Sequence, residues 1–451
     1  MPRTAEQLRS DALQIWWAGV QAVQPPSLIF NNVRVAEGAL WIGDERLELD
    51  AIDRIVIVGG GKASGGMATT LEQALGPELL QTKRVIGWVN VPADCVVPTD
   101  RVTLHPARPA GVNEPTEAGV SGVQEMLRLV GDMGPRDLCV ALISGGGSAL
   151  MPAPVEGLSL ADKVEITREL SARGAAIDLM NAVRRDLSTF KGGGLARACR
   201  AGRMISLILS DVPGDDLHAV ASGPTVSALS DKARAIEILK QFSLDQLPAG
   251  RRAIDLLSLR RDLPPDENHA EIGRRVTNLI VGNNAAAVDA SGVEAERLGY
   301  SHAMLSATAP EGPVEEVARR LAETANRMRR QDSPDCLITG GEPTVSLAPA
   351  DVRGSGGRNQ QLALAALAAI DDWRGLALVS GGTDGEDGPT DAAGALVDEQ
   401  VASDARRLLL DMPVHLARND AYSFFQAAGG LLKTGPTQTN VCDLRVVTVS
   451  R

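Results

Sequence analysis

Short apolar runs alternate with longer amphipathic stretches along the first half of the chain. The apolar, β-branched runs predict strands at 54–58, 85–89, 138–143 and 205–209. Helical spacing of the apolar residues predicts helices near 64–75, 115–130, 160–173 and 190–200. Strands that alternate with helices form a parallel sheet covered on both faces, so the pattern predicts a doubly wound, Rossmann-like α/β domain.

The alternation returns after a polar stretch at 248–271, which its proline and arginine content identifies as a linker. Beyond it, strands are predicted at 277–281, 336–339, 376–380 and 446–449, and helices near 283–298, 313–330, 359–370 and 399–410. With 451 residues the chain is about three times the ~150 of one domain. We therefore expect two α/β domains, at 1–250 and 272–451, with a cleft between them.

Composition removes several classes of protein. A net charge of −12 argues against a nucleic-acid or acidic-membrane partner, and arginine pairs such as Arg184 and Arg185 are interpreted as solvated. The five cysteines are scattered and form no C-x-x-C pair, which argues against disulfides or a zinc site and favours a reducing compartment. The longest uncharged apolar stretch is too short to cross a bilayer. We expect a soluble cytoplasmic protein, either a monomer or a homodimer.

Five apolar runs end directly in turns rich in glycine or aspartate, where α/β enzymes hold anions. The first turn offers Gly60, Gly61, Lys62 and Ser64 at the start of a helix. It is not a dinucleotide fingerprint, because Ser64 stands at the sixth position, and not a Walker loop, because Ala63 follows the lysine. A lysine among bare amides suits a transferring phosphoryl group. A solvated lysine beside a packing turn is the alternative.

The second glycine turn has three successive glycines, which let a backbone wrap a phosphate chain closely. Its candidate nucleotide-binding residues are Ser144, Gly145, Gly146, Gly147 and Ser148. A tight turn between strand and helix is the alternative interpretation.

Three later turns carry charged side chains. Asp211 follows a predicted strand and is a candidate Mg²⁺ ligand. Arg358 and Asn359 stand at a helix entry after a glycine-rich loop, where an arginine can fork onto a phosphate or a carboxylate. The acidic turn after 376–380 holds Asp384 and Asp387, whose carboxylates could bind Mg²⁺ or take a proton from a hydroxyl. A solvated acidic turn is the alternative there.

Together these strings resemble the class II glycerate 2-kinase family, whose C-terminal part is the MOFRL domain. They are GGGKASGGMA, LISGGGSALMPAP, LSDVPGDDLHAVASGPT, GGEPTV, GRNQQLALA, SGGTDGEDGPTDAAGA and TGPTQTNVCDL. The resemblance runs over nearly the whole chain and is weakest between about 245 and 275. It implies a large Rossmann-like domain and a smaller MOFRL-type domain.

The resemblance also implies an activity and a set of site residues. Family members phosphorylate D-glycerate with ATP and Mg²⁺ to give 2-phosphoglycerate. The family's essential lysine falls on Lys62, its essential arginine on Arg358, and its acidic loop on Asp384 and its neighbours. We assign catalysis to these three residues, substrate binding to Arg358, Asn359 and Asp384, and Mg²⁺ binding to Asp211 and Asp387. Some members carry the label hydroxypyruvate reductase, and an NAD(P)H-dependent reductase remains the alternative.

Overall fold

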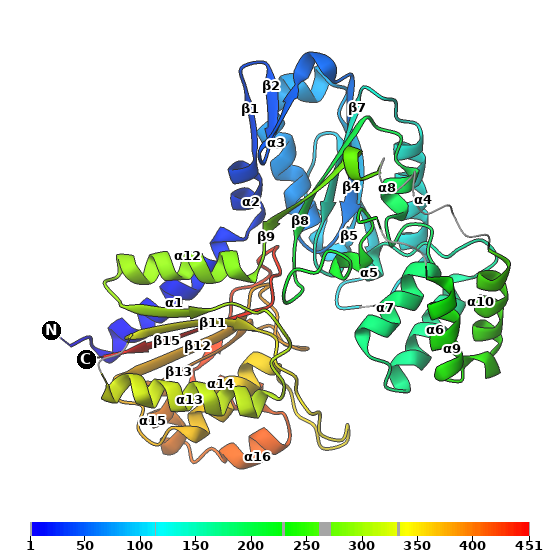
Figure 1. The fold of residues 1–451 in the computed structure, drawn as a ribbon. Coiled ribbons are helices and arrows are strands. Elements are labelled where there is room, and N and C mark those ends of the chain that lie inside the picture. The colour runs from blue at the N-terminus through cyan, green and yellow to red at the C-terminus, as the bar shows by residue number, and fades with distance from the viewer. Residues whose placement is uncertain (1, 113, 228–230, 261–271, 332–333, 451) are drawn as a thin grey trace. The chain divides into compact units, whose positions relative to one another are not determined.

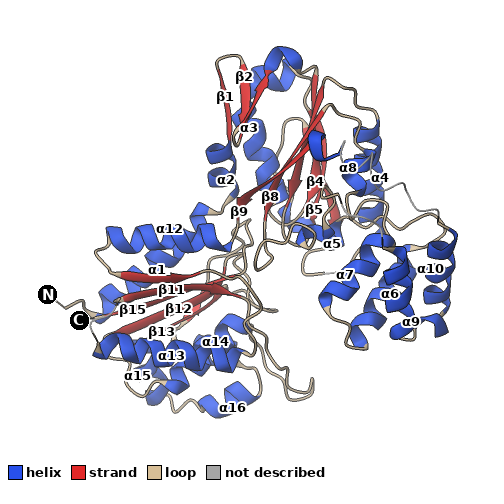
Figure 2. Cartoon of the chain, in the orientation of Figure 1, coloured by secondary structure: helices blue, strands red, loops and turns tan. Residues whose placement is uncertain are grey.

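The computed structural model describes residues 2–112, 114–227, 231–260, 272–331 and 334–450, and the chain forms two compact units. The N-terminal unit comprises Pro25–Ser210 and Asp215–Val281; the C-terminal unit comprises Met1–Gln24, Asp211–Gly214 and Gly282–Arg451. Both are α/β, as predicted (Figures 1 and 2). No helix of the described residues is long and apolar enough to cross a membrane, and all five cysteines are free thiols.

The N-terminal unit is built on a six-stranded sheet with the order β6-β5-β4-β7-β8-β9. Its strands are β4 (Arg54–Gly60), β5 (Ile86–Pro92), β6 (Val102–Arg108), β7 (Asp137–Ile143), β8 (Arg203–Leu209) and β9 (Val276–Gly282). The pairs from β6 to β8 are parallel, which confirms the predicted parallel sheet. Every residue of the central β7 is buried, as expected for a strand covered on both faces.

Helices follow these strands and carry a second, smaller core. They are α3 (Ser64–Thr82), α4 (Glu117–Gly131), α5 (Gly147–Leu150), α6 (Leu160–Ala172), α7 (Ile177–Asp186), α8 (Gly194–Ala198), α9 (Lys232–Gln241) and α10 (Pro248–Leu259). Buried residues of α6, α7, α9 and α10 form one apolar cluster. The unit also contains α2 (Pro25–Asn32) and an antiparallel sheet of β1 (Val33–Ala36), β2 (Ala39–Ile42) and β3 (Glu45–Glu48).

The predicted linker is wrong at its start. Residues 248–259 form α10, which begins with Pro248 at its first turn, where a missing N–H costs nothing. The arginines that suggested a linker are the polar face of this helix, while Ala253 and Leu257 are buried. The remainder of the predicted linker, 261–271, lies outside the described residues.

The C-terminal unit is built on a mixed six-stranded sheet with the order β10-β11-β15-β12-β13-β14. Its strands are β10 (His302–Leu305), β11 (Cys336–Gly341), β12 (Leu376–Gly382), β13 (Gly394–Asp398), β14 (Leu431–Leu432) and β15 (Asp443–Val449). Its helices are α1 (Ala5–Ala22), α12 (Asn284–Arg297), α13 (Val314–Arg330), α14 (Arg358–Ala369), α15 (Glu399–Arg407), α16 (Met412–Ala417) and α17 (Ala421–Ala428). Helices α1 and α12 cover one face, and α13 and α14 cover the other (Figure 2).

The structure divides the chain at places other than the predicted bounds 1–250 and 272–451. Helix α1 packs on α12 and β15 of the C-terminal unit, where Trp16 is buried and donates its indole N–H to the Leu444 carbonyl at 3.0 Å. Strand β9, predicted for the second domain, lies beside β8 in the first sheet. Apolar periodicity shows which face of an element is buried and does not show which sheet buries it.

Candidate functional site

Two glycine turns of the N-terminal unit are joined into one structure. The β4 turn and the β7 turn lie side by side because these strands are parallel neighbours that end together, Gly60 opposite Ile143. The Lys62 amide donates to the Gly145 carbonyl at 3.0 Å. Gly61 has a φ of +151°, and a Cβ there would lie 2.0 Å from the Ser144 hydroxyl, so only glycine lets the turns approach this closely.

Ser64 and Ser144 hold the two turns together. Both are fully buried, and their hydroxyls lie 3.1 Å apart. The Ser144 hydroxyl accepts from the Ala63 amide at 3.1 Å, and the Ser64 hydroxyl donates to the Leu142 carbonyl at 3.1 Å. These hydroxyls hold the two turns together, and the contact of both serines with a nucleotide stays a prediction.

Lys62 and Arg108 flank Gly146. A Cβ built on Gly146 would lie 3.8 Å from Lys62 Cγ and 3.6 Å from Arg108 Nη2. Lys62 is half-buried, and Arg108, the last residue of β6, is buried and donates to the Val112 carbonyl. A lysine side chain and a guanidinium therefore lie beside a glycine turn, a combination that suits a phosphate group.

The end of the second glycine turn is fixed by a lysine that the sequence did not single out. The buried Lys191 donates from Nζ to the Ser148 carbonyl at 2.7 Å and to the Ser148 hydroxyl at 2.6 Å. Burial, with the nearby charges of Lys163 and Arg184, holds the pKa of Lys191 well below its usual range.

In the C-terminal unit, three turns meet at one edge of the sheet. Strands β11 and β12 end at Gly341 and Gly382, and both residues pair with Asp443, the first residue of β15. Asp443 is therefore the centre of this edge, with Glu342 following β11 and Asp384 following β12.

Arg358, the first residue of α14, is bound to this acidic edge. Its Nε and Nη2 donate to the two Asp443 carboxylate oxygens at 2.8 and 3.0 Å, and Nη1 donates to Glu342 at 2.7 Å. Burial alone lowers the pKa of Arg358, but the two carboxylates outweigh burial and hold it above its usual range. The side chain keeps 34% of its surface exposed, and a guanidinium carries further N–H donors, so it can still meet a ligand.

Asn359 and Asp387 fix the start of α14. Asp387 accepts from the backbone amides of Asn359 and Gln360 at 3.0 and 2.8 Å. Asn359 donates from its side chain to Asp443 at 2.9 Å and accepts from Ser380 at 2.7 Å. A Cβ on Gly357 would lie 2.3 Å from Asp387, so this turn requires glycine.

The structure describes the surroundings of the two predicted magnesium ligands, Asp211 and Asp387. Asp387 is 2% exposed and its oxygens accept from the start of α14, so the structure shows it as a helix cap, and its metal role stays a prediction. Burial raises its pKa to about 7. The Asp211 carbonyl accepts from Cys442 Sγ at 3.1 Å. Within the described residues no three His, Cys, Asp or Glu side chains gather as metal ligands.

Asp384 lies closer to solvent than Asp387. It is half-buried, its carboxylate accepts from the Glu386 amide at 3.2 Å, and its carbonyl accepts from the Thr437 amide at 3.2 Å. Its carboxylate is therefore held by the turn at the same sheet edge as Asp443. A held carboxylate can orient a hydroxyl or accept its proton.

Sequence reasoning missed Arg108, Lys191, Glu342 and Asp443. Two of them carried a usable signal, because Glu342 directly follows the ITGG strand end and Asp443 lies three residues before the predicted strand at 446–449. Arg108 ends a strand that the pattern did not reveal. Lys191 lies in a polar stretch whose burial depends on tertiary packing.

Comparison with known proteins agrees with an α/β phosphotransferase. Residues 11–254 match a family model described as a domain of unknown function, DUF4147, and residues 335–443 match the MOFRL family. The chain is 34% identical to the Homo sapiens protein named glycerate kinase, over 98% of this chain and 93% of that one. It is also 34% identical to an Agrobacterium vitis protein named putative hydroxypyruvate reductase, over 99% of both.

A solved structure shares the whole fold. The crystal structure titled glycerate kinase from Thermotoga maritima superposes with a TM-score of 0.82 at 31% identity, covering 98% of this chain and 100% of that one. The chain belongs to the class II glycerate kinase family.

Proposed function

We propose that this protein transfers the γ-phosphoryl group of MgATP to the 2-hydroxyl of D-glycerate, giving ADP and 2-phosphoglycerate. The observation that carries the proposal is the joined pair of glycine turns, which presents Lys62 and Arg108 beside Gly146 at the carboxyl edge of a parallel sheet. Family membership supports the same reaction. Magnesium enters this proposal bound to the nucleotide phosphates.

The residues take distinct roles in the transfer. Lys62 neutralises the transferring phosphoryl group, and the amides around Gly145, Gly146 and Gly147 hold the phosphate chain. Arg358 binds the glycerate carboxylate with the donors that Asp443 and Glu342 leave available. Asn359 supports Arg358 by sharing Asp443. Asp384 orients the 2-hydroxyl or accepts its proton as that oxygen attacks the γ-phosphorus and ADP leaves.

The free thiols fit a reducing compartment, so we also propose a cytoplasmic location. The name of the Agrobacterium vitis relative makes NAD(P)H-dependent hydroxypyruvate reduction the rival activity. A dinucleotide-binding turn has a glycine or alanine at its sixth position, which allows close packing of helix and strand. In this chain that position is Ser64, whose hydroxyl lies within hydrogen-bond distance of Ser144 in the neighbouring turn.

One assay separates the two activities. ADP formation should require both D-glycerate and Mg²⁺, and NMR of the product should show the phosphate on carbon 2. A product phosphorylated on carbon 3 would reject the regiochemistry. NADH oxidation with hydroxypyruvate at a comparable turnover, without glycerate-dependent ADP formation, would reject the kinase.

A further inference from the structure

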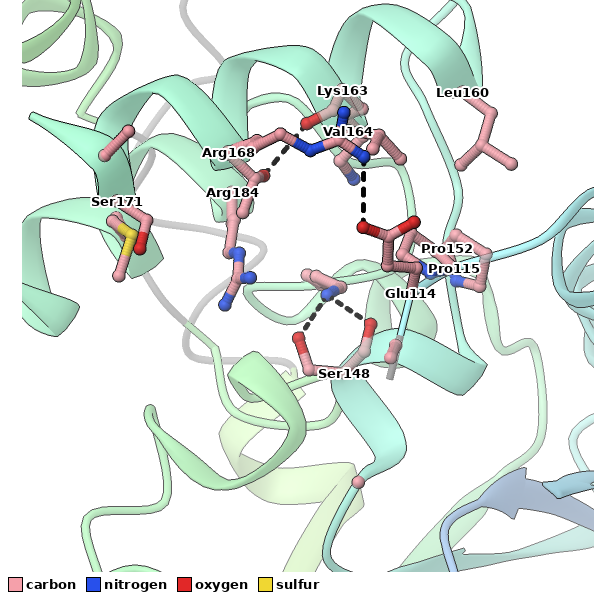
Figure 3. A pocket seen from close by; sticks show the side chains of 16 residues that line it. Glu114, Pro115, Ser148, Pro152, Leu160, Lys163, Val164, Arg168, Ser171 and Arg184 are labelled. Carbon is pink, nitrogen blue, oxygen red and sulfur yellow. Dashed lines mark hydrogen bonds and ion pairs between the residues drawn. The ribbon is translucent and has the colours of Figure 1, made fainter. Parts of the chain in front are cut away.

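Beside the second glycine turn lies a pocket of about 630 Å³ with a cationic interior (Figure 3). Helices α5, α6 and α7 contribute to it, together with Glu114 and Pro115 before α4 and Lys191 after α7. Gly146 and Ser148 line it, so it opens onto the turn that is joined to Lys62. Its volume is within the range of roughly 300–1,000 Å³ found for small-molecule sites.

Lys163 is the unexplained residue of this pocket. Only 8% of it is exposed, and its Nζ has no hydrogen-bond partner among the described residues. A buried ammonium normally has a partner, because losing its hydration without compensation is costly. Lys163 is held in place by α6, whose N-terminal capping box joins Ser159 to Asp162. An ammonium held in a pocket without a hydrogen-bond partner can bind an anion that enters from solvent.

Two more cations surround Lys163. Arg184 on α7 and the buried Lys191 line the same pocket, and Figure 3 shows Arg184 reaching towards the space above Ser148. Among the described lining residues Glu114 is the one carboxylate, and its side chain pairs with Arg168 at 3.0 Å on an exposed edge. The interior therefore carries positive charge that no acidic side chain of the lining balances.

Burial and neighbouring charge act on the protonation of these side chains. Burial, and to a smaller extent the charge of Arg184, lower the pKa of Lys163 to about 7. Burial also lowers the pKa of Arg184. From α10, which packs against α6, Arg252 is neutralised by Asp162. A bound anion would raise the pKa values of Lys163 and Arg184 and so favour their charged forms.

We propose that this pocket is the nucleotide site, with Lys163, Arg184 and Lys191 binding the polyphosphate and the apolar wall of Leu160, Val164, Met180, Pro115 and Pro152 receiving the purine. The assignment rests on the proposed phosphoryl transfer. Three converging cations match a polyphosphate better than the single carboxylate of glycerate. The apolar wall suits a flat heterocycle.

Direct binding of Mg·ADP, measured by calorimetry without glycerate, tests the assignment independently of turnover. Lys163→Met should weaken ADP at least about tenfold, the effect of losing one charge-assisted hydrogen bond. Lys240→Met, the same change on the exposed face of α9, should leave the affinity unchanged. Arg184→Gln provides a second variant should Lys163→Met fold poorly, and it should weaken ADP in the same direction.

Proton uptake gives a second readout. At pH 7.5 wild-type binding should take up protons, which appears as a dependence of the binding heat on buffer ionisation enthalpy, since ADP raises the pKa of Lys163. The affinity should fall as pH rises above 7, by up to about tenfold per pH unit. Both effects should shrink in Lys163→Met.

Each outcome decides between the two proposals. Unchanged ADP binding in Lys163→Met and Arg184→Gln, or weakened binding of D-glycerate alone, would overturn the nucleotide pocket even if the wild-type protein makes 2-phosphoglycerate. Weakened ADP binding in a protein that makes no 2-phosphoglycerate would keep the pocket and reject the proposed function.

Discussion

Arg358 and Asp443 are 85 residues apart in the chain and are joined by two parallel hydrogen bonds, Nε to Oδ2 at 2.8 Å and Nη2 to Oδ1 at 3.0 Å. The pair links the first turn of α14 to the first residue of β15. A guanidinium held by two bonds cannot rotate freely, so its outer face is fixed before any substrate arrives.

Arg358→Lys should lower kcat/KM for D-glycerate roughly fivefold to 150-fold, a loss of about 1–3 kcal/mol in transition-state binding, because an ammonium keeps the charge and loses the planar fork. Steady-state kinetics with both substrates measure it. The matched control is Arg374→Lys, an exposed arginine of the same unit paired with Asp372, which should behave as wild type. Unchanged kinetics in Arg358→Lys would remove this arginine from the substrate site.

Lys62→Ala should lower kcat by at least ~10², the scale for losing one preorganised charge-stabilising group. The fold should survive, because the backbone bond from residue 62 to Gly145 does not need the side chain. Turnover together with circular dichroism checks both expectations, and Lys240→Ala serves as the control. Retention of a third of the wild-type kcat would reduce Lys62 to a residue of a packing turn.

Asp384→Asn should lower kcat by about 10²–10⁴ at every Mg²⁺ concentration, because an amide cannot accept the hydroxyl proton. Asp391→Asn is the control from the same loop, since Asp391 is largely exposed and bonded to Lys433. Kinetics across a magnesium titration distinguish the roles. Recovery of the rate at high magnesium would make Asp384 a metal ligand instead.

Asp387→Asn should destabilise the C-terminal unit by about 1–2 kcal/mol, the usual cost of a lost helix cap, since an amide oxygen cannot replace both carboxylate oxygens at Asn359 and Gln360. Denaturant unfolding measures this. Excess magnesium should restore neither stability nor rate. A rate restored by magnesium would return Asp387 to the metal site.

Lys163→Met should raise the free energy of unfolding of the ligand-free protein at pH 7, because it removes a buried ammonium without a partner. The pKa of Lys163 is about 7 when folded and lies near 10.5 when unfolded, so the unfolded state binds more protons between these values. Wild-type stability should therefore rise relative to the variant from pH 7 to 10, by up to about 1.4 kcal/mol per unit. Denaturant unfolding of both proteins across this pH range measures the difference. If the two free energies of unfolding change in parallel with pH, burial does not deprotonate Lys163.

The sequence predicted elements well where a single strand or turn supplied the information. The parallel strands β4, β7 and β8 are continuous apolar runs, and each was placed within two residues. Lys62 and Arg358 were singled out because glycines mark the turns that hold them. Helix α10 was missed because its proline and arginine content is typical of a linker. Only the burial of its apolar face distinguishes this helix from a linker.

The sequence did not predict residues whose surroundings are formed by segments far away in the chain. Asp443 gains its role from the register that places it opposite Gly341 and Gly382, and Lys163 gains its role from the packing of α6 against α7. The sequence predicted that Arg184 and Arg185 are solvated, whereas Arg184 lines the pocket beside the second glycine turn. Pairing register and helix packing are set by contacts between separated segments, which local periodicity does not encode.

The position of α1 has a consequence for biosynthesis. This helix leaves the ribosome before every other described element, and β15, the strand it packs against and the central partner of β11 and β12, leaves last. Trp16 thus cannot reach its hydrogen-bond partner, the Leu444 carbonyl, until β15 has emerged, whereas the N-terminal unit has all its strands by residue 282. Until then the nascent chain carries α1 without its full set of packing partners, a state in which chaperone binding or premature association competes with folding.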